Sequence, residues 1–140
     1  MTTQPRKVHG RFEELTEVEC RDLMGVKSVG RIGFVAQDGP AILPVNYVVH
    51  EGDIVFRTAP YNVVAGSVRG QRVAFEVDEL DDFLQAGWSV LVVGQADFVE
   101  DEDELPPDRS ERPEPWAEGS RPLYVRVTAA RITGRRVLPQ

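Results

Sequence analysis

The chain has 140 residues, of which 41% are hydrophobic and 28% are charged, which is typical of a single globular domain with one core. Its twelve glycines and ten prolines are scattered, so we expect many turns and short elements instead of a helical bundle. Uninterrupted apolar stretches such as Val90 to Val93 are far shorter than the roughly twenty residues of a membrane-spanning helix. The first residues lack the apolar segment of a secretory signal, so we expect a cytoplasmic protein that does not associate with a membrane.

The net charge of −7 is concentrated in one segment. Residues 100–119 hold nine of the 23 acidic side chains and two of the 16 basic ones, which leaves 14 of each elsewhere. This balance provides no basic patch, which argues against nucleic-acid binding. Cys20 is the only cysteine and the chain has two histidines, so neither a disulfide nor a metal site is predicted.

The N-terminal region divides into an arm and a helix. Residues 1–14 show no periodicity and predict a flexible N-terminal arm ahead of a single domain over residues 15–140. Thr16 and Glu19 have the spacing of a capping box, which predicts the start of a helix of about ten residues. Cys20 lies at the fourth position of that helix, where packing against the residue before the cap gives it a structural role.

Beyond the helix, apolar and polar residues alternate with the period of β-strands. The predicted strands cover residues 30–36, 41–50, 54–58, 72–78, 88–99, 123–129 and 131–138, the last of which continues or pairs with the one before it. A short helix is predicted between Pro60 and Gly70. Six or seven short strands hide their edges best by closing into a small antiparallel barrel. Because Val90 to Val93 are apolar on both faces, we expect a second subunit to cover the outer face in a homodimer.

Residues 100–120 predict an acidic, proline-rich excursion from the domain. The first five positions of this segment are all acidic, and the four prolines that follow prevent a long helix. We expect a solvated segment that Trp116 attaches to the barrel.

Six ordered blocks of sequence carry a resemblance to a known family. They are Gly30-Arg31-Ile32-Gly33-Phe34, Pro44-Val45-Asn46-Tyr47, Ile54-Val55-Phe56-Arg57-Thr58, Val73-Ala74-Phe75-Glu76-Val77-Asp78, Gly87-Trp88-Ser89-Val90 and Ile132-Thr133-Gly134-Arg135. Together they resemble the pyridoxamine 5′-phosphate oxidase-like flavin-binding split-barrel proteins, particularly small actinobacterial members, over about residues 12 to 138. The resemblance implies a mainly β protein: a six- to seven-stranded antiparallel split β-barrel with one N-terminal helix and short peripheral helices. It also implies a homodimer that binds FMN or coenzyme F420 in a groove between its subunits.

The resemblance also implies a set of cofactor-binding residues. They are Pro44, Val45, Asn46, Tyr47, Phe56, Arg57 and Thr58 of one subunit, with Trp88 and Ser89 of the other. Arg57 is the best phosphate ligand among them because a guanidinium is planar, bidentate and permanently charged, although it could instead pair with an acid on a neighbouring strand. Family members that hold FMN strongly usually have a lysine shortly after this strand. Residues 60–64 contain none, and the loss of one such contact costs about 1.5–3 kcal/mol.

The resemblance implies an FMN- or F420-dependent oxidoreductase that acts on a small organic substrate. No catalytic side chain is identified, because a flavin carries the chemistry of hydride transfer itself. One alternative is a non-catalytic barrel dimer that binds a flavin or another small ligand and has lost the phosphate-binding lysine. A further alternative is a haem-binding barrel with His50 as ligand. Glu76 and Asp78 share one strand face, which we interpret as a solvated face beside Arg72 and not as an acid/base pair.

Overall fold

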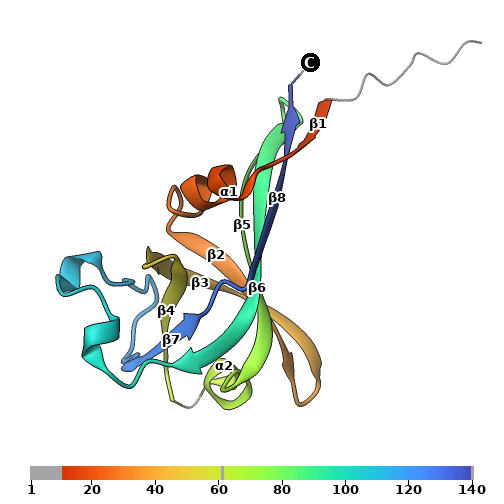
Figure 1. Cartoon of the computed structure of the whole chain (residues 1–140). Coiled ribbons are helices and arrows are strands. Elements are labelled where there is room, and N and C mark those ends of the chain that lie inside the picture. The colour runs from red at the N-terminus through yellow and green to blue at the C-terminus, as the bar shows by residue number, and fades with distance from the viewer. Residues whose placement is uncertain (1–10, 61, 140) are drawn as a thin grey trace, which may run out of the picture.

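The computed structural model describes residues 11–60 and 62–139 (Figure 1). Its strands are β1 (Arg11–Glu14), β2 (Val29–Ala36), β3 (Gly39–His50), β4 (Asp53–Thr58), β5 (Gln71–Asp81), β6 (Ala86–Phe98), β7 (Leu123–Val127) and β8 (Arg131–Leu138). Its helices are α1 (Glu17–Met24) and α2 (Val63–Ser67), with short 3-10 turns η1 (Glu102–Glu104) and η2 (Arg109–Glu111). No helix in the described part of the chain has the length and apolar character that crossing a membrane requires.

All strands pair antiparallel, in the order β1-β8-β6-β5-β2-β3-β4-β7. A further pairing of β6 with β7 closes the six strands from β6 to β7 into a barrel. The long strand β6 makes this possible because its residues 96–98 pair with β7 and its residues 87–93 pair with β8. The structure thus confirms the predicted antiparallel barrel with one N-terminal helix. The predicted strand over residues 131–138 is β8, but it pairs with β6 and β1 and not with β7, so that part of the prediction is wrong.

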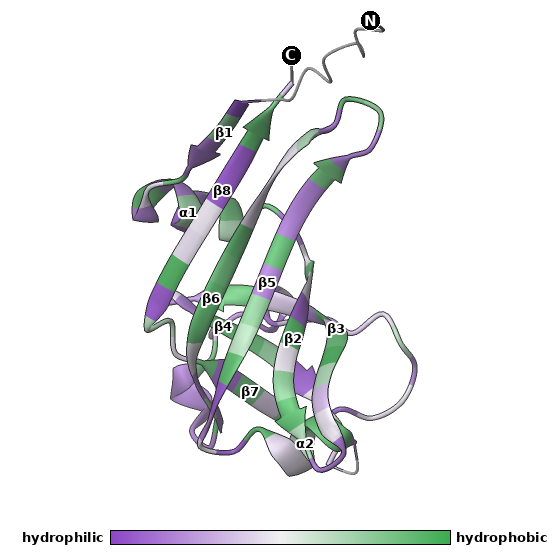
Figure 2. Cartoon of the chain, turned by 90° about the vertical axis from the view of Figure 1, so that its right-hand side faces the viewer, coloured by the Kyte–Doolittle hydropathy of each residue, from purple (hydrophilic) through white to green (hydrophobic). Residues whose placement is uncertain are grey.

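The barrel interior is filled by the alternate apolar side chains of its strands. Ile32, Phe75 and Val92 lie on neighbouring strands at matched positions, and each is fully buried. In Figure 2 hydrophobic colour dominates β6, whereas β8 alternates between hydrophobic and hydrophilic residues. Gly94 of β6 has no room for a Cβ because the carbonyl oxygen of Thr128 occupies that place. This close approach lets the connection from β7 to β8 cross over β6.

Both helices have the caps that their sequences favour. At α1, the Thr16 amide donates to Glu19 Oε1 at 3.0 Å, and the Glu19 amide donates to Thr16 Oγ1 at 3.2 Å, which confirms the capping box. Cys20 of α1 is fully buried, and burial raises the pKa of its thiol. The predicted short helix is α2, which Asn62 caps by accepting hydrogen bonds from two backbone amides.

The prediction of an arm over residues 1–14 is wrong for its last four residues. Residues 11–14 form β1, which pairs with β8 from Arg11↔Leu138 to Glu14↔Arg135. This pairing joins opposite ends of the chain, and a four-residue strand is too short to reveal its periodicity in sequence. The rest of the predicted arm, residues 1–10, lies outside the described residues.

The acidic excursion is attached to the barrel differently from the prediction. Trp116 is 78% exposed and is not the anchor, whereas Leu105 is only 3% exposed. Arg126 of β7 donates to the Glu104 carbonyl oxygen at 2.7 Å and lies 3.5 Å from the Glu104 carboxylate. Figure 1 shows η1 and η2 beside β4 and β7. The excursion therefore lies against the outer surface of the barrel through Leu105 and Glu104, while most of its residues are exposed as predicted.

Candidate functional site

The candidate site lies where strands β3 and β4 separate. Their pairing begins at His50↔Asp53 and ends at Tyr47↔Phe56. Beyond that point, residues 43–46 continue along β2, whereas Arg57 and Thr58 pair only with β7. The barrel is therefore split here, and the two diverging strands leave room between them for side chains or a ligand.

A cavity of about 160 Å³ occupies this split. It is bounded by β3, the end of β4, the start of α2 and the last part of the excursion, and its lining residues are Leu43, Pro44, Val45, Asn46, Arg57, Thr58, Asn62, Val64, Pro115, Ala117 and Arg121. Five of the residues predicted from the resemblance thus meet in one place: Pro44, Val45, Asn46, Arg57 and Thr58. The lining contains two arginines and no carboxylate, so the cavity favours an anion.

Arg57 is held in place but keeps most of its binding capacity. Its Nε donates to the carbonyl oxygen of Arg121 at 2.9 Å, and its guanidinium carbon lies 5.3 Å from the centre of the Tyr124 ring. Among the described residues, no carboxylate oxygen lies within 4.0 Å of Arg57, so the alternative of a structural ion pair is not observed. The two terminal amino groups of Arg57 have no hydrogen-bond partner in the described chain, and they are therefore free to bind an anion.

Thr58 places an unsatisfied hydroxyl at the same cavity. The residue is 2% exposed, and its Oγ1 has no hydrogen-bond partner among the described residues. A buried polar group without a partner costs about 1–3 kcal/mol, so such groups are rare unless they serve a purpose. A ligand in the cavity would give this hydroxyl a partner.

Arg121 is a residue of the site that the sequence analysis missed. Its Nη1 donates to the carbonyl oxygens of Ala117 and Glu118 at 3.0 and 2.9 Å, which folds the end of the excursion into a loop. The loop is also fixed by Asn46, whose Oδ1 accepts from the Trp116 amide at 2.9 Å. Arg121 is far from Arg57 in sequence, and only the pairing of β4 with β7 brings the two together. Its sole sequence signal is a basic residue just before a strand.

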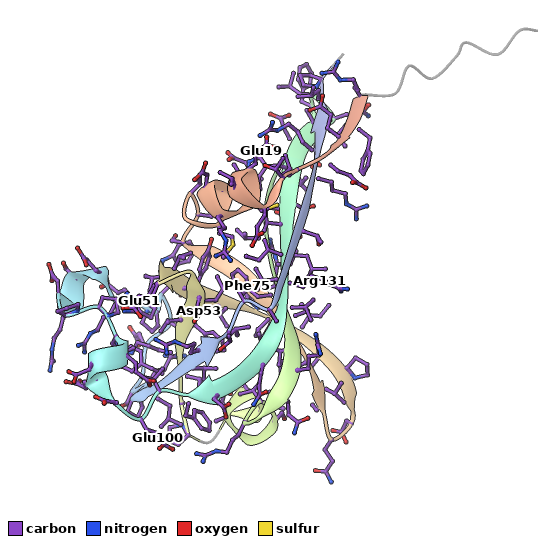
Figure 3. The ribbon with its side chains drawn as sticks, viewed as in Figure 1. Glu19, Glu51, Asp53, Phe75, Glu100 and Arg131 are labelled. Atoms are coloured by element: carbon purple, nitrogen blue, oxygen red, sulfur yellow. The ribbon has the colours of Figure 1, made fainter. Side chains whose placement is uncertain are left out.

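Tyr47 and Phe56 belong to the barrel interior and not to the cavity lining. The Tyr47 hydroxyl donates to the Met24 carbonyl oxygen, and its ring lies edge-on to Phe75 at 4.7 Å between centroids. Figure 3 labels Phe75 within the barrel. Burial raises the pKa of Tyr47 to about 12. Phe56 is fully buried. Tyr47 and Phe56 are the last residue pair between β3 and β4 before the two strands separate.

Trp88 and Ser89 lie on β6, away from the cavity of the same chain. They pair with Arg136 and Arg135 of β8, and Ser89 lines a separate groove of about 470 Å³. Trp88 is partly buried and packs against the core. One chain therefore does not bring these two residues to the split, and their contact with a cofactor remains a prediction that requires a second subunit.

Glu76 and Asp78 face Arg31 and not Arg72, so the interpretation of a solvated face beside Arg72 needs correction. Arg31 Nη1 lies 3.3 Å from Glu76 Oε1 and 3.4 Å from Asp78 Oδ2, because β2 pairs with β5 at this position. The two carboxylic side chains are 36% and 20% exposed. Burial, and then the adjacent Asp78, raise the pKa of Glu76 to about 7.

His50 lies at the end of β3, outside the cavity. Its side chain is 18% exposed, and its Nε2 lies 3.9 Å from Glu51 Oε1. In residues 11–60 and 62–139, no group of three or more His, Cys, Asp or Glu side chains is placed to hold a metal ion.

The family model described as pyridoxamine 5′-phosphate oxidase matches residues 16–136, which is most of the chain. The chain belongs to this family. An uncharacterized protein from Mycobacterium tuberculosis is 34% identical over 131 residues, which cover 89% of this chain and 85% of the relative.

Two solved structures are also similar to this member of the pyridoxamine 5′-phosphate oxidase family. The FAD-binding protein of Mycobacterium smegmatis is 31% identical, with a TM-score of 0.69, and the match covers 90% of this chain and 98% of the other. A Corynebacterium glutamicum protein with the provisional name pyridoxamine 5′-phosphate oxidase is 32% identical, with a TM-score of 0.74 and coverage of 92% and 95%. The family membership predicted from the six sequence blocks is thereby confirmed.

The cavity fits the phosphate end of a flavin better than a whole flavin. Its volume is below the roughly 300–1,000 Å³ of sites that enclose a drug-sized ligand. It provides two guanidiniums and the unsatisfied hydroxyl of Thr58, which are donors that suit a phosphate. The apolar residues Leu43, Pro44 and Val45 line its β3 side. In this family member, Arg57, Thr58 and Arg121 are therefore the residues that could hold a cofactor phosphate.

Proposed function

We propose that this protein is an FMN- or F420-dependent oxidoreductase that acts on a small organic substrate. The observation that carries the proposal is the meeting of Arg57, Thr58 and Arg121 at one cavity whose lining contains no carboxylate. Family membership and the similarity to an FAD-binding protein from Mycobacterium smegmatis support a flavin or deazaflavin as the ligand.

Arg121 could supply the positive charge that a lysine after β4 supplies in family members that hold FMN strongly. A hydrogen bond from a cationic side chain to a phosphate contributes about 1.5–3 kcal/mol, which corresponds to roughly ten- to hundred-fold in affinity. Arg121 lines the same cavity as Arg57, so it brings a second permanent positive charge to the split. We infer that Arg121 takes the place of that lysine, and that the cofactor phosphate lies between the two guanidiniums.

The protein would contribute binding and orientation to the reaction. A bound flavin supplies hydride transfer through its ring system, so the protein needs no nucleophile. Arg57 and Arg121 would fix the phosphate end, and the apolar side chains of Pro44 and Val45 would direct the rest of the cofactor out of the cavity. We propose that a second subunit completes the site through Trp88 and Ser89. Leu91, on the same strand, supports this because it leaves 36% of its surface exposed on the outer face.

The second candidate is a dimer that binds the cofactor without turnover. The observation that favours it is the absence from residues 60–64 of the lysine that family members holding FMN strongly usually have.

A fluorescence titration with FMN and with coenzyme F420 tests the proposal. We expect wild type to bind at least one of them at micromolar concentration and Arg57→Ala to bind it roughly ten- to hundred-fold more weakly. Arg131→Ala is the matched control, because Arg131 is an exposed arginine on the opposite side of the molecule from the excursion (Figure 3).

Failure of wild type to bind either cofactor would overturn the proposal, as would equal affinities of wild type and Arg57→Ala. Turnover separates the two candidates. An oxidoreductase reduces an added acceptor repeatedly when it is supplied with reduced cofactor, and Arg57→Ala loses this activity. A purely binding protein takes up the cofactor but shows no turnover with any acceptor.

A further inference from the structure

A second cavity adjoins the candidate site on the outer side of β4 and β7. Its volume is about 430 Å³, and it is lined by Arg57, Arg109, Ser110, Arg112, Pro113, Glu114 and Tyr124. The excursion therefore forms one wall and the barrel forms the other. Arg57 lines both this cavity and the smaller one in the split, so its guanidinium stands between them.

The excursion is acidic overall, but its two basic residues both line this cavity. Several carboxylates of the excursion make contacts outside this cavity. Asp101 and Asp108 cap η1 and η2, and Glu104 lies beside Arg126. Only Glu114 contributes an acidic side chain to the cavity. Because Arg112 is paired with Glu102, the charge of the cavity is set by Arg57 and Arg109 against Glu114. This leaves an excess of positive charge, opposite in sign to the excursion as a whole.

The two arginines of the excursion have different roles. Arg112 is committed to holding the excursion together: its Nε donates to the Pro106 carbonyl oxygen at 2.8 Å, and its Nη1 lies 3.3 Å from Glu102. Arg109 is exposed, and among the described residues its side chain makes no hydrogen bond or ion pair. The guanidinium of Arg109 is therefore available to bind a ligand.

We propose that this second cavity binds an anionic extension of the cofactor, beyond the phosphate held in the split. The proposal rests on the proposed function. Because Arg57 lines both cavities, a cofactor whose phosphate contacts Arg57 would place a further anionic group on the side of Arg109. A volume of about 430 Å³ is in the range that encloses a drug-sized group. The ligand class is a flavin or deazaflavin with further negative charge after its first phosphate, such as the second phosphate of FAD or the glutamyl tail of F420.

FMN lacks such an extension, so the cavity should produce a preference that a titration can measure. We expect wild type to bind FAD or F420 at least about ten-fold more tightly than FMN, the effect of one added charge-assisted contact. Arg109→Ala should abolish this advantage and leave the affinity for FMN unchanged. Glu114→Gln removes the only negative side chain of the cavity and should strengthen binding of the extended cofactor. Arg131→Ala should change neither affinity.

The outcomes separate this inference from the proposed function. If wild type binds none of the three cofactors, the proposed function fails and the inference fails with it. If wild type binds FMN as tightly as both extended cofactors, or if Arg109→Ala weakens FMN as much as them, the inference is wrong while the proposed function stands. Comparison of FAD with F420 identifies which extension the cavity takes.

Discussion

The unsatisfied hydroxyl of Thr58 provides a test in which stability and binding change in opposite directions. Thr58 is 2% exposed and its Oγ1 has no partner among the described residues. Because an unsatisfied buried polar group costs about 1–3 kcal/mol, Thr58→Val should raise the free energy of unfolding of the ligand-free protein by about 1 kcal/mol. For a domain of this size, that corresponds to a rise in Tm of about 3 °C.

The same substitution should weaken the cofactor. A hydroxyl that donates to a phosphate contributes about 1.5–3 kcal/mol, so the Kd of the cofactor should rise roughly ten- to hundred-fold in Thr58→Val. Thermal unfolding monitored by circular dichroism gives the first quantity and a flavin titration gives the second. Thr58→Ser, which keeps the hydroxyl, should preserve most of the affinity. Thr128→Val, at an exposed position between β7 and β8, should alter neither quantity. A loss of stability in ligand-free Thr58→Val, or an unchanged Kd, would refute the reasoning.

Three further variants test individual contacts. Glu76 has its pKa raised from 4.5 to about 7 by burial and by Asp78, so the folded protein binds this proton more tightly and loses stability as the pH rises through that window. Urea unfolding at both ends of the window should show a smaller loss for Glu76→Gln, and an equal loss would contradict the assignment. Asn46→Ala should speed cleavage after Glu118 by a glutamyl endopeptidase, because it frees the Trp116 amide, and unchanged cleavage would show that this bond does not hold the loop. Leu105→Ala should lower the free energy of unfolding by about 2–5 kcal/mol, whereas a surface residue would show almost no change.

Much of the fold was predictable because its signals are local. Period-two alternation gave the barrel strands, and the spacing of Thr16 and Glu19 gave the start of α1. The pairing of β1 with β8 was not predictable, since it depends on contact between the two ends of the chain. The anchor of the excursion was missed for a similar reason. Trp116 is the larger apolar side chain, but Leu105 is the one that the chain path brings to the barrel.

The candidate site was predictable in part. The resemblance identified the two strands that separate at the split. Five of the predicted residues therefore line one cavity: Pro44, Val45, Asn46, Arg57 and Thr58. Side-chain direction within those strands was harder to predict. Tyr47 and Phe56 are close in sequence to these residues but point into the core at the last rung before the split.

The residues that the excursion and the segment after it contribute were not predictable. Arg109 lies in the excursion and Arg121 directly follows it, in a stretch without periodicity. The pairing of β4 with β7 brings Arg121 to Arg57, whereas the fold of the excursion brings Arg109 there. The excursion is acidic overall, so its sequence does not suggest a basic cavity. Net charge counted along a sequence does not show which side chains lie together in the fold.

The most direct test of the account compares FMN with riboflavin, which has the same ring system but no phosphate, by calorimetric titration of the wild-type protein. Our account predicts that FMN binds at least roughly hundred-fold more tightly than riboflavin, because several charge-assisted contacts hold the phosphate, and that Arg57→Ala reduces this difference roughly ten- to hundred-fold. Equal affinities of the wild-type protein for the two ligands would show that the split between β3 and β4 does not bind a phosphate.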